Sequence, residues 1–127
     1  MTPRILIVDD ASFIREILKT LAQKQGWRVV AEAEDGEEAV QLAVKHMPDI
    51  IIMDIVMPKD NGITAARRIL RKLTNVSIIG LSTMNNEDVM AQAIEAGFCS
   101  YITKPFENWM IIGAVNEILD KGVQKSG

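Results

Sequence analysis

The stretch Ile5–Asp10, with the sequence ILIVDD, decides the fold, because four apolar residues lead directly into two adjacent carboxylates. A second stretch, Asp49–Asp54, has the sequence DIIIMD and also ends an apolar run in an acid. Short apolar runs of this kind are typical of strands that are buried on both faces of a parallel sheet. Two such strands that end in acids predict one site shared by both strand ends.

Length and composition fit a single globular domain, since 127 residues with 48% hydrophobic content can supply one sizeable core. The net charge of -3 gives no electrostatic reason to expect binding to nucleic acid or to an anionic membrane surface. The single cysteine, Cys99, excludes an internal disulfide framework. No apolar run approaches the roughly 18 residues of a membrane helix. We therefore expect a cytoplasmic protein that binds neither nucleic acid nor a membrane.

Strand and helix patterns alternate five times along the chain. The predicted strands are 5–8, 28–33, 49–53, 76–82 and 99–103, and the predicted helices are 13–25, 35–46, 63–73, 86–96 and 108–121. The predicted N-caps are Ser12, Asp35 and Asn85, and Gly26 and Gly97 follow two helix ends. Glu38 lies three residues after Asp35, which is the spacing of a capping box.

Five strand and helix repeats imply an α/β fold, in which a five-stranded parallel sheet carries helices on both faces. Ligands of such sheets collect at the carboxyl ends of the strands. The polar residues expected at that edge are Asp9, Asp10, Asp54, Ser82, Thr83 and Lys104. We expect one domain over residues 1–122, a flexible tail over 123–127, and one crevice lined by these side chains.

The predicted crevice has the composition of a phosphoryl-transfer site. Three carboxylates close together repel one another and raise at least one pKa unless a cation neutralises them, so a divalent metal is expected. A ligand set made only of oxygen atoms suits Mg²⁺, or Mn²⁺ in its place, better than zinc. Lys104 adds a positive charge that can stabilise phosphoryl oxygens, which leaves Asp54 as the nucleophile that forms an aspartyl phosphate.

Four motifs, ILIVDD, IIMDIVMP, GLST and YITKPF, resemble in order and spacing the receiver domain of two-component response regulators. The resemblance covers nearly the whole chain. Because no effector domain follows in the sequence, we expect a stand-alone receiver of the chemotaxis type. The resemblance implies the strand order 2-1-3-4-5 and a cis peptide bond before Pro105.

The resemblance also implies the role of each site residue. Asp9 and Asp10 handle the metal together with Asp54, and Val56 belongs to the same metal site. Asp54 accepts the phosphoryl group and Lys104 contacts its oxygens, with Ser82 as a further catalytic residue. The implied switch residues are Ser82, Thr83, Tyr101 and Pro105.

Two positions depart from the chemistry expected near the phosphoryl group. Val56 and Met84 each lie two residues after a site residue, where family members flank the attacking water, and neither side chain can orient water by a hydrogen bond. We therefore expect these two residues to set a slow rate of self-dephosphorylation. Lys59, Asp60 and Asn61 also depart from the common pattern, and we interpret them as peripheral.

The implied function is that of a phosphorelay response regulator, which takes a phosphoryl group from a histidine kinase or a phosphotransfer protein. Such a protein is a phosphoacceptor that assists its own phosphorylation and dephosphorylation, and is no enzyme in the usual sense. Phosphorylation is expected to switch a protein-binding surface, which binds a target such as a flagellar motor switch component. The protein is expected to be a monomer.

The last predicted helix indicates where that surface lies. Ile111, Val115, Ile118 and Leu119 follow the spacing of one buried stripe. Trp109 and Ile112 then point partly away from the core, and together with Tyr101 they form the predicted output surface. The alternative interpretation is that Trp109 folds back over the chain as a lid on the core.

Other classes of protein share parts of this pattern. The chain could be a receiver cut from a multidomain transcriptional regulator, which the polar tail cannot exclude. The chain could also be a Mg²⁺-dependent aspartyl-phosphate phosphatase of the haloacid dehalogenase type. The motif of those enzymes has a second acid two residues after the nucleophile, where this chain has Val56. A nucleotide-binding or flavin-binding domain would need a glycine-rich or hydroxyl-rich loop where this chain has the acidic DDASF.

Overall fold

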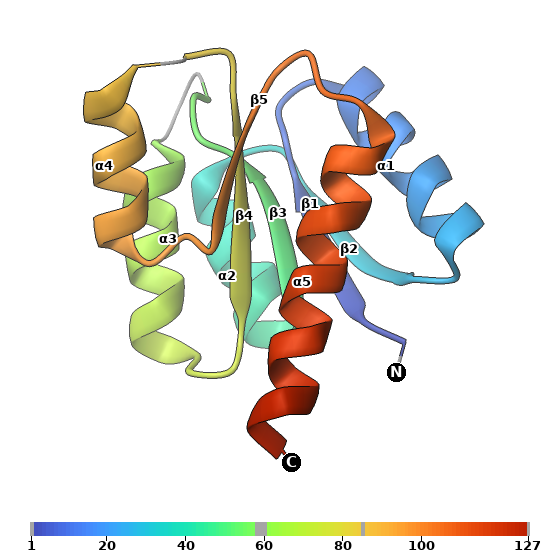
Figure 1. The fold of residues 1–127 in the computed structure, drawn as a ribbon. Coiled ribbons are helices and arrows are strands. Elements are labelled where there is room, and N and C mark those ends of the chain that lie inside the picture. Colours follow the sequence, from blue (N-terminus) through green and yellow to red (C-terminus); the bar gives the residue numbers. More distant parts are fainter. Residues whose placement is uncertain (1, 58–60, 85, 127) are drawn as a thin grey trace.

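The computed structural model describes residues 2–57, 61–84 and 86–126, and five strands alternate with five helices along them (Figure 1). The elements are β1 (Arg4–Val8), α1 (Ser12–Gln25), β2 (Arg28–Ala33), α2 (Gly36–His46), β3 (Ile50–Asp54), α3 (Gly62–Lys72), β4 (Ser77–Ser82), α4 (Glu87–Ala96), β5 (Ser100–Thr103) and α5 (Asn108–Ser126). The predicted order of strands and helices is confirmed throughout.

The strands form one parallel sheet in the order β2-β1-β3-β4-β5, which confirms the order implied by the resemblance. Helices α1 and α5 cover one face of the sheet, and α2, α3 and α4 cover the other (Figure 1). Successive side chains of β1 enter different cores, since Ile5 and Ile7 pack toward α1 and α5, whereas Leu6 and Val8 pack toward the other three helices. The central strands are apolar without alternation because both of their faces are covered.

Two of the predicted helix caps differ from the structure. Ser12 is the first helical residue rather than the cap, because the carbonyl of Ala11 already accepts the N–H groups of Ile14 and Arg15. Asn85 lies outside the described residues, and Asn86 caps α4 by accepting the N–H of Val89 at 2.8 Å. Both errors are one residue long, since a polar residue beside the true cap looks equally suitable in the sequence.

Other helix ends follow the predictions more closely. Asp35 caps α2 by accepting the N–H of Glu38 at 2.9 Å, and Glu38 in turn accepts the N–H of Glu34 at 3.0 Å. Gly26 ends α1 with a φ of 76°, in the left-handed region that favours glycine. Helix α5 continues to Ser126, so the predicted end at Lys121 was too early, while the domain boundary at residue 122 and the flexible tail stay predictions. Among the described residues, no helix combines the length and the apolar character that crossing a bilayer requires.

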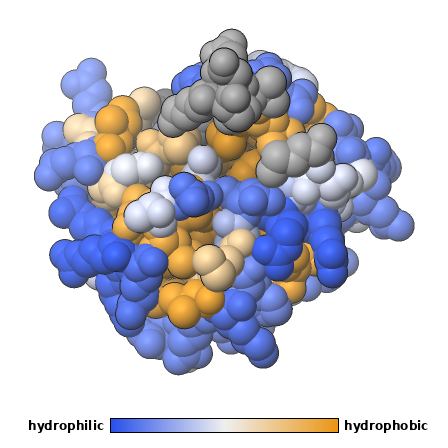
Figure 2. All heavy atoms as spheres, turned by 90° about the horizontal axis from the view of Figure 1, so that it is seen from below, coloured by the Kyte–Doolittle hydropathy of each residue, from blue (hydrophilic) through white to orange (hydrophobic). Residues whose placement is uncertain are grey.

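Some hydrophobic side chains are exposed at the edge of the sheet where the strands begin. Figure 2 shows this edge from below, where hydrophobic areas lie between hydrophilic residues. Met47 belongs to this edge because its carbonyl accepts from Arg4 at the start of β1, and its side chain is exposed. An exposed apolar side chain such as that of Met47 therefore does not by itself mark a functional site.

Candidate phosphoryl-acceptor site

The predicted acidic and basic residues meet at the carboxyl edge of the sheet. Asp9 directly follows β1, Asp54 is the last residue of β3, and Lys104 directly follows β5. Strands β1 and β3 are neighbours in the sheet, so the two acids at their ends lie side by side. The parallel arrangement thus converts three distant sequence positions into one cluster, as the sequence predicted.

The three carboxylates lie within reach of one cation. Asp9, Asp10 and Asp54 each offer an oxygen, and these oxygens lie within 4.8 Å of one another. Asp9 is fully buried and Asp54 is 5% exposed, whereas Asp10 is exposed to solvent. One oxygen of Asp9 accepts the N–H of Ala11 at 2.9 Å, which fixes the direction of its carboxylate.

Lys104 supplies the positive charge of the cluster. Its Nζ donates to Oδ2 of Asp9 at 2.7 Å and lies 3.4 Å from Oδ2 of Asp54. Burial lowers the pKa of Lys104, but the hydrogen bond to Asp9 and the charges of Asp54 and Asp9 outweigh it and raise the pKa overall. The ammonium is therefore held in its charged form. The predicted cis peptide bond between Lys104 and Pro105 is confirmed.

The pKa of the Asp54 carboxyl lies well above its ordinary value. Burial raises its pKa most strongly, and the negative charge of Asp9 raises it further, to about 6. Lys104 and the N–H of Val56, which donates to Oδ1 at 3.2 Å, act in the opposite direction. The sequence predicted a raised pKa from charge crowding, but desolvation is the larger cause.

The residues present fit a magnesium or manganese ion. All the side-chain donors of the cluster are carboxylate oxygens, which are the ligands that these ions prefer, and a cation would offset the crowding that raises the pKa of Asp54. The side chain of Val56 is apolar, so any part that this residue takes in a metal site belongs to its backbone. Its role as a metal residue stays a prediction.

Two of the four predicted switch residues, Ser82 and Tyr101, bind the backbone of Met84. Ser82 is buried, and its Oγ accepts the N–H of Met84 at 3.0 Å. The hydroxyl of Tyr101 donates to the carbonyl of Met84. Thr83, between Ser82 and Met84, is exposed. Ser82 and Tyr101 are thus linked through the backbone of Met84, a connection that spacing in the sequence could not reveal.

The two residues predicted to tune the rate are both exposed. Val56 is 48% exposed and Met84 is 42% exposed. Their backbone N–H groups bind Asp54 and Ser82, so the two side chains flank the site residues but offer no donor or strong acceptor to water.

The predicted output surface is only partly exposed. Trp109 is 69% exposed, which contradicts the alternative that it forms a lid on the core. Ile112, which we predicted to be exposed, is half-buried and packs against the core beneath α5, because the buried stripe is wider than its spacing suggested. Ile111 and Val115 are fully buried, whereas Ile118 and Leu119 are half-buried.

Three residues that sequence reasoning set aside or missed also shape the site. Asn61 caps α3 by accepting the N–H of Ile63 at 2.8 Å, so it is not peripheral, and Lys59 and Asp60 lie outside the described residues. Gly62 leaves no room for a side chain, because a Cβ there would lie 2.5 Å from the carbonyl oxygen of Asp54. Arg15 donates to the carbonyl of Asp9 at 2.7 Å. The Asn-Gly pair was a usable turn signal, whereas nothing in the sequence distinguished Arg15.

Comparison with known proteins agrees with this geometry. The family model of the response regulator receiver domain matches residues 5–116. The chain belongs to this family. It is 42% identical over 120 residues to a chemotaxis protein CheY of Bacillus subtilis, covering 94% of this chain and 100% of that protein. A CheY of Thermotoga maritima is also 42% identical, over 93% of this chain and 98% of that protein.

Solved structures of receivers have the same fold. The CheX-CheY-BeF3-Mg²⁺ complex of Borrelia burgdorferi includes a chain with a TM-score of 0.87 and 30% identity, over 91% of this receiver and 88% of that chain. A LuxR-family regulator of Aurantimonas has a TM-score of 0.89 and 34% identity, over 95% of this receiver and 87% of that chain. Some matched proteins are longer, since this receiver covers 54% of the transcriptional regulator PdtaR of Mycobacterium tuberculosis at 39% identity. Family membership supports phosphorelay signalling and favours neither the phosphatase nor the nucleotide-binding alternative.

Proposed function

We propose that this receiver accepts a phosphoryl group on Asp54 from the phosphohistidine of a histidine kinase or a phosphotransfer protein. The observation that carries the proposal is the setting of the Asp54 carboxylate, which has an oxygen within 4.8 Å of those of Asp9 and Asp10 and lies 3.4 Å from the ammonium of Lys104. A carboxylate in this setting is a nucleophile with a cation beside it, at the edge of the sheet where parallel folds bind ligands.

The transfer needs Asp54 in its ionised form. With a pKa of about 6, the carboxylate is mostly ionised near neutral pH, at a ratio of roughly ten to one. A carboxylate oxygen forms the new bond to phosphorus while the bond from phosphorus to the imidazole nitrogen breaks, and the electron pair stays on that nitrogen. Lys104 is placed to stabilise the charge on the phosphoryl oxygens.

Asp9, Asp10 and Asp54 would hold Mg²⁺, which Mn²⁺ can replace, and the bound ion would neutralise phosphoryl charge. The donor set supports this assignment, and so does the similarity to a chain of the CheX-CheY-BeF3-Mg²⁺ complex of Borrelia burgdorferi. Lys104 and the N–H of Val56 hold the Asp54 carboxylate, so the receiver assists its own phosphorylation and dephosphorylation without turning over a separate substrate.

Phosphorylation would act on the residues around Met84. The new group adds close to two negative charges and three acceptor oxygens near β4. These acceptors would draw the Ser82 hydroxyl away from the N–H of Met84, with Thr83 moving alongside. Tyr101, which is bound to the Met84 carbonyl, would then shift. Pro105 directly follows Lys104 in the loop after β5. The output surface around Tyr101 and Trp109 would be repacked for a target protein.

The pathway assignment rests on named relatives. The relatives in Bacillus subtilis and Thermotoga maritima are chemotaxis proteins, so we assign this receiver to chemotaxis, with a target such as a flagellar motor switch component. We place its action in the cytoplasm, as a monomer that contacts proteins rather than nucleic acid or membranes.

Labelling with acetyl phosphate and Mg²⁺ tests the proposed acceptor. The protein should form an adduct that is stable in acid and labile in base, and Asp54→Asn should abolish it. Asp88→Asn, at an exposed position at the start of α4, is the matched control and should label like the wild type. Equal labelling of Asp54→Asn and wild type would show that the acceptor is another residue.

A further inference from the structure

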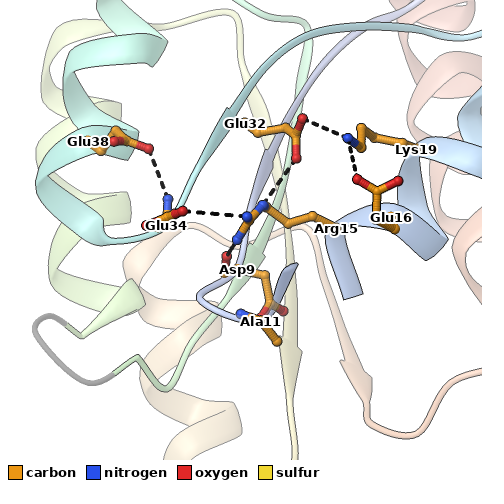
Figure 3. A network of polar contacts seen from close by, with 8 residues as sticks. All are labelled: Asp9, Ala11, Arg15, Glu16, Lys19, Glu32, Glu34 and Glu38. Atoms are coloured by element: carbon orange, nitrogen blue, oxygen red, sulfur yellow. Dashed lines mark hydrogen bonds and ion pairs between the residues drawn. The ribbon is translucent and has the colours of Figure 1, made fainter. Parts of the chain in front are cut away.

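The guanidinium group of Arg15 joins three segments beside the acidic pair. Its side chain is only 12% exposed. Nε donates to Glu32 of β2 at 3.1 Å, Nη1 donates to the carbonyl of Asp9 at 2.7 Å, and Nη2 lies 3.5 Å from Glu34 after β2 (Figure 3). The three nitrogens of the fork therefore each have a different acceptor.

The bond from Arg15 to Asp9 acts on the peptide that connects the two acids of the metal site. A peptide unit is planar, so fixing the carbonyl of Asp9 also fixes the N–H of Asp10. Ala11 and Lys104 hold the carboxylate of Asp9 from the other side. Asp10, in contrast, is exposed, and the direction of its side chain depends on the backbone that carries it.

The acceptors around Arg15 are themselves held in place. Lys19 binds the second oxygen of Glu32 at 3.0 Å, and the N–H of Glu34 donates to Glu38 at 3.0 Å (Figure 3). Glu32 and Glu34 together carry more negative charge than Arg15 carries positive charge. The guanidinium can therefore lie close to a cation site without a net positive charge around it.

We propose that Arg15 is a positioning residue for the divalent cation: it orients Asp10 toward Asp9 through the peptide between them. This inference rests on the proposed function, in which both acids hold Mg²⁺. A lysine could not take this role, because a single ammonium has no planar fork with which to meet three acceptors in fixed directions.

Calorimetric titration with Mg²⁺ tests the inference without any phosphoryl transfer. Arg15→Lys keeps the charge and removes the fork, so it should raise the Kd for Mg²⁺ about tenfold, as expected when a group that orients a metal ligand is lost. Arg15→Gln should weaken binding at least as much. The matched control is Lys19→Gln, which perturbs the same Glu32 but touches no atom of the acidic pair, and its Kd should stay within about twofold of wild type.

Thermal unfolding of each variant in a chelator separates positioning from stability, and the titrations are done well below each melting temperature. If the Arg15 variants melt earlier but bind Mg²⁺ like wild type, Arg15 only ties α1 to β2 and the inference is wrong. If Arg15→Lys is unchanged and Arg15→Gln binds more tightly, charge alone matters and the inference is again wrong. If the wild type itself binds no Mg²⁺, the proposed function and the inference about Arg15 both fail. This outcome is distinguishable from the two above, in which the wild type binds Mg²⁺.

Discussion

The two sides of the site differ in how firmly they are held. On the anchored side, which we define as Asp9, Asp54 and Lys104, the charged groups are largely buried and bonded to one another or to backbone N–H groups. On the exposed side, defined as Val56 and Met84, the side chains are about half exposed and apolar. The charged groups are therefore held in fixed positions, whereas the exposed positions beside them, Val56 and Met84, carry no polar side chain.

This difference has a physical reason. Charges in a poorly solvated cluster must have partners in fixed directions, because an unpaired buried charge is costly. Apolar side chains at an exposed rim need no partner and hold no water. We therefore expect the anchored side to govern how fast Asp54 reacts and the exposed side to govern how long the phosphorylated product lasts.

Removing Lys104 breaks the anchored side and has the largest expected effect. Lys104→Ala should slow labelling by acetyl phosphate about 100-fold, because the ammonium that faces both Asp54 and the incoming phosphoryl oxygens is lost. Lys121→Ala removes an exposed lysine that pairs with Glu117 on the surface of α5, and it should label at the wild-type rate. Equal rates for both variants would mean that Lys104 has no part in the transfer.

Adding a polar group to the exposed side should shorten the lifetime of the phosphorylated protein. Val56→Asn places an amide where water approaches the acyl phosphate, and hydrolysis should become faster by on the order of tenfold. The control Val44→Asn changes a comparably exposed valine on α2 and should leave the decay unchanged. Decay is followed by loss of radiolabel after removal of the donor, and an unchanged or slower rate for Val56→Asn would contradict the water-positioning account.

The pH dependence of stability reports the cost of the charge on Asp54. Its pKa in the folded protein, about 6, lies above the ordinary value of 3.8, so the folded state binds this proton more tightly than the unfolded state. This group therefore adds stability as pH falls from 7 to 4. Relative to wild type, Asp54→Asn should be more stable at pH 7, by on the order of 1 kcal/mol after allowing for solvent screening, and the advantage should shrink toward pH 4.

Urea unfolding of both proteins in a chelator, at pH 7 and pH 5, measures this difference. Comparing the two proteins at each pH cancels the opposite contributions of Glu32 and Glu37, whose pKa values are lowered by their basic partners despite the burial of Glu32. The same difference in unfolding free energy between wild type and Asp54→Asn at pH 7 and at pH 5 would contradict a raised pKa of Asp54.

The smallest expected effect on stability is that of Trp109→Ala, because the side chain is mostly exposed. The free energy of unfolding should change by less than about 0.5 kcal/mol, whereas Ile111→Ala, two residues further and fully buried, should cost about 2–5 kcal/mol. Pull-down with the protein in its beryllofluoride form should lose its target in Trp109→Ala. Intact target binding together with a large drop in melting temperature would show that Trp109 is part of the core.

Local patterns predicted most of the fold. The periodicity of apolar residues gave every strand and helix, because burial on one or both faces leaves its mark within a few residues. Caps were less certain, as Ser12 and Asn85 show, since neighbouring polar residues compete for the same role. The end of α5 was also missed, because Gly122, directly after Lys121, does not by itself stop a helix.

The sequence by itself determined that Asp9, Asp54 and Lys104 lie at strand ends, since each ends or follows an apolar run. Because the carboxyl ends of parallel strands lie at one edge of the sheet, the sequence also predicted that the three residues share that edge. Only the tertiary structure decided which atoms meet. The contact of Arg15 with the carbonyl of Asp9, and the link of Ser82 to Tyr101 through Met84, join segments whose relative positions depend on packing. The desolvation that raises the pKa of Asp54 is likewise a property of the assembled core, because burial is set by all the elements around a residue and by none of them alone.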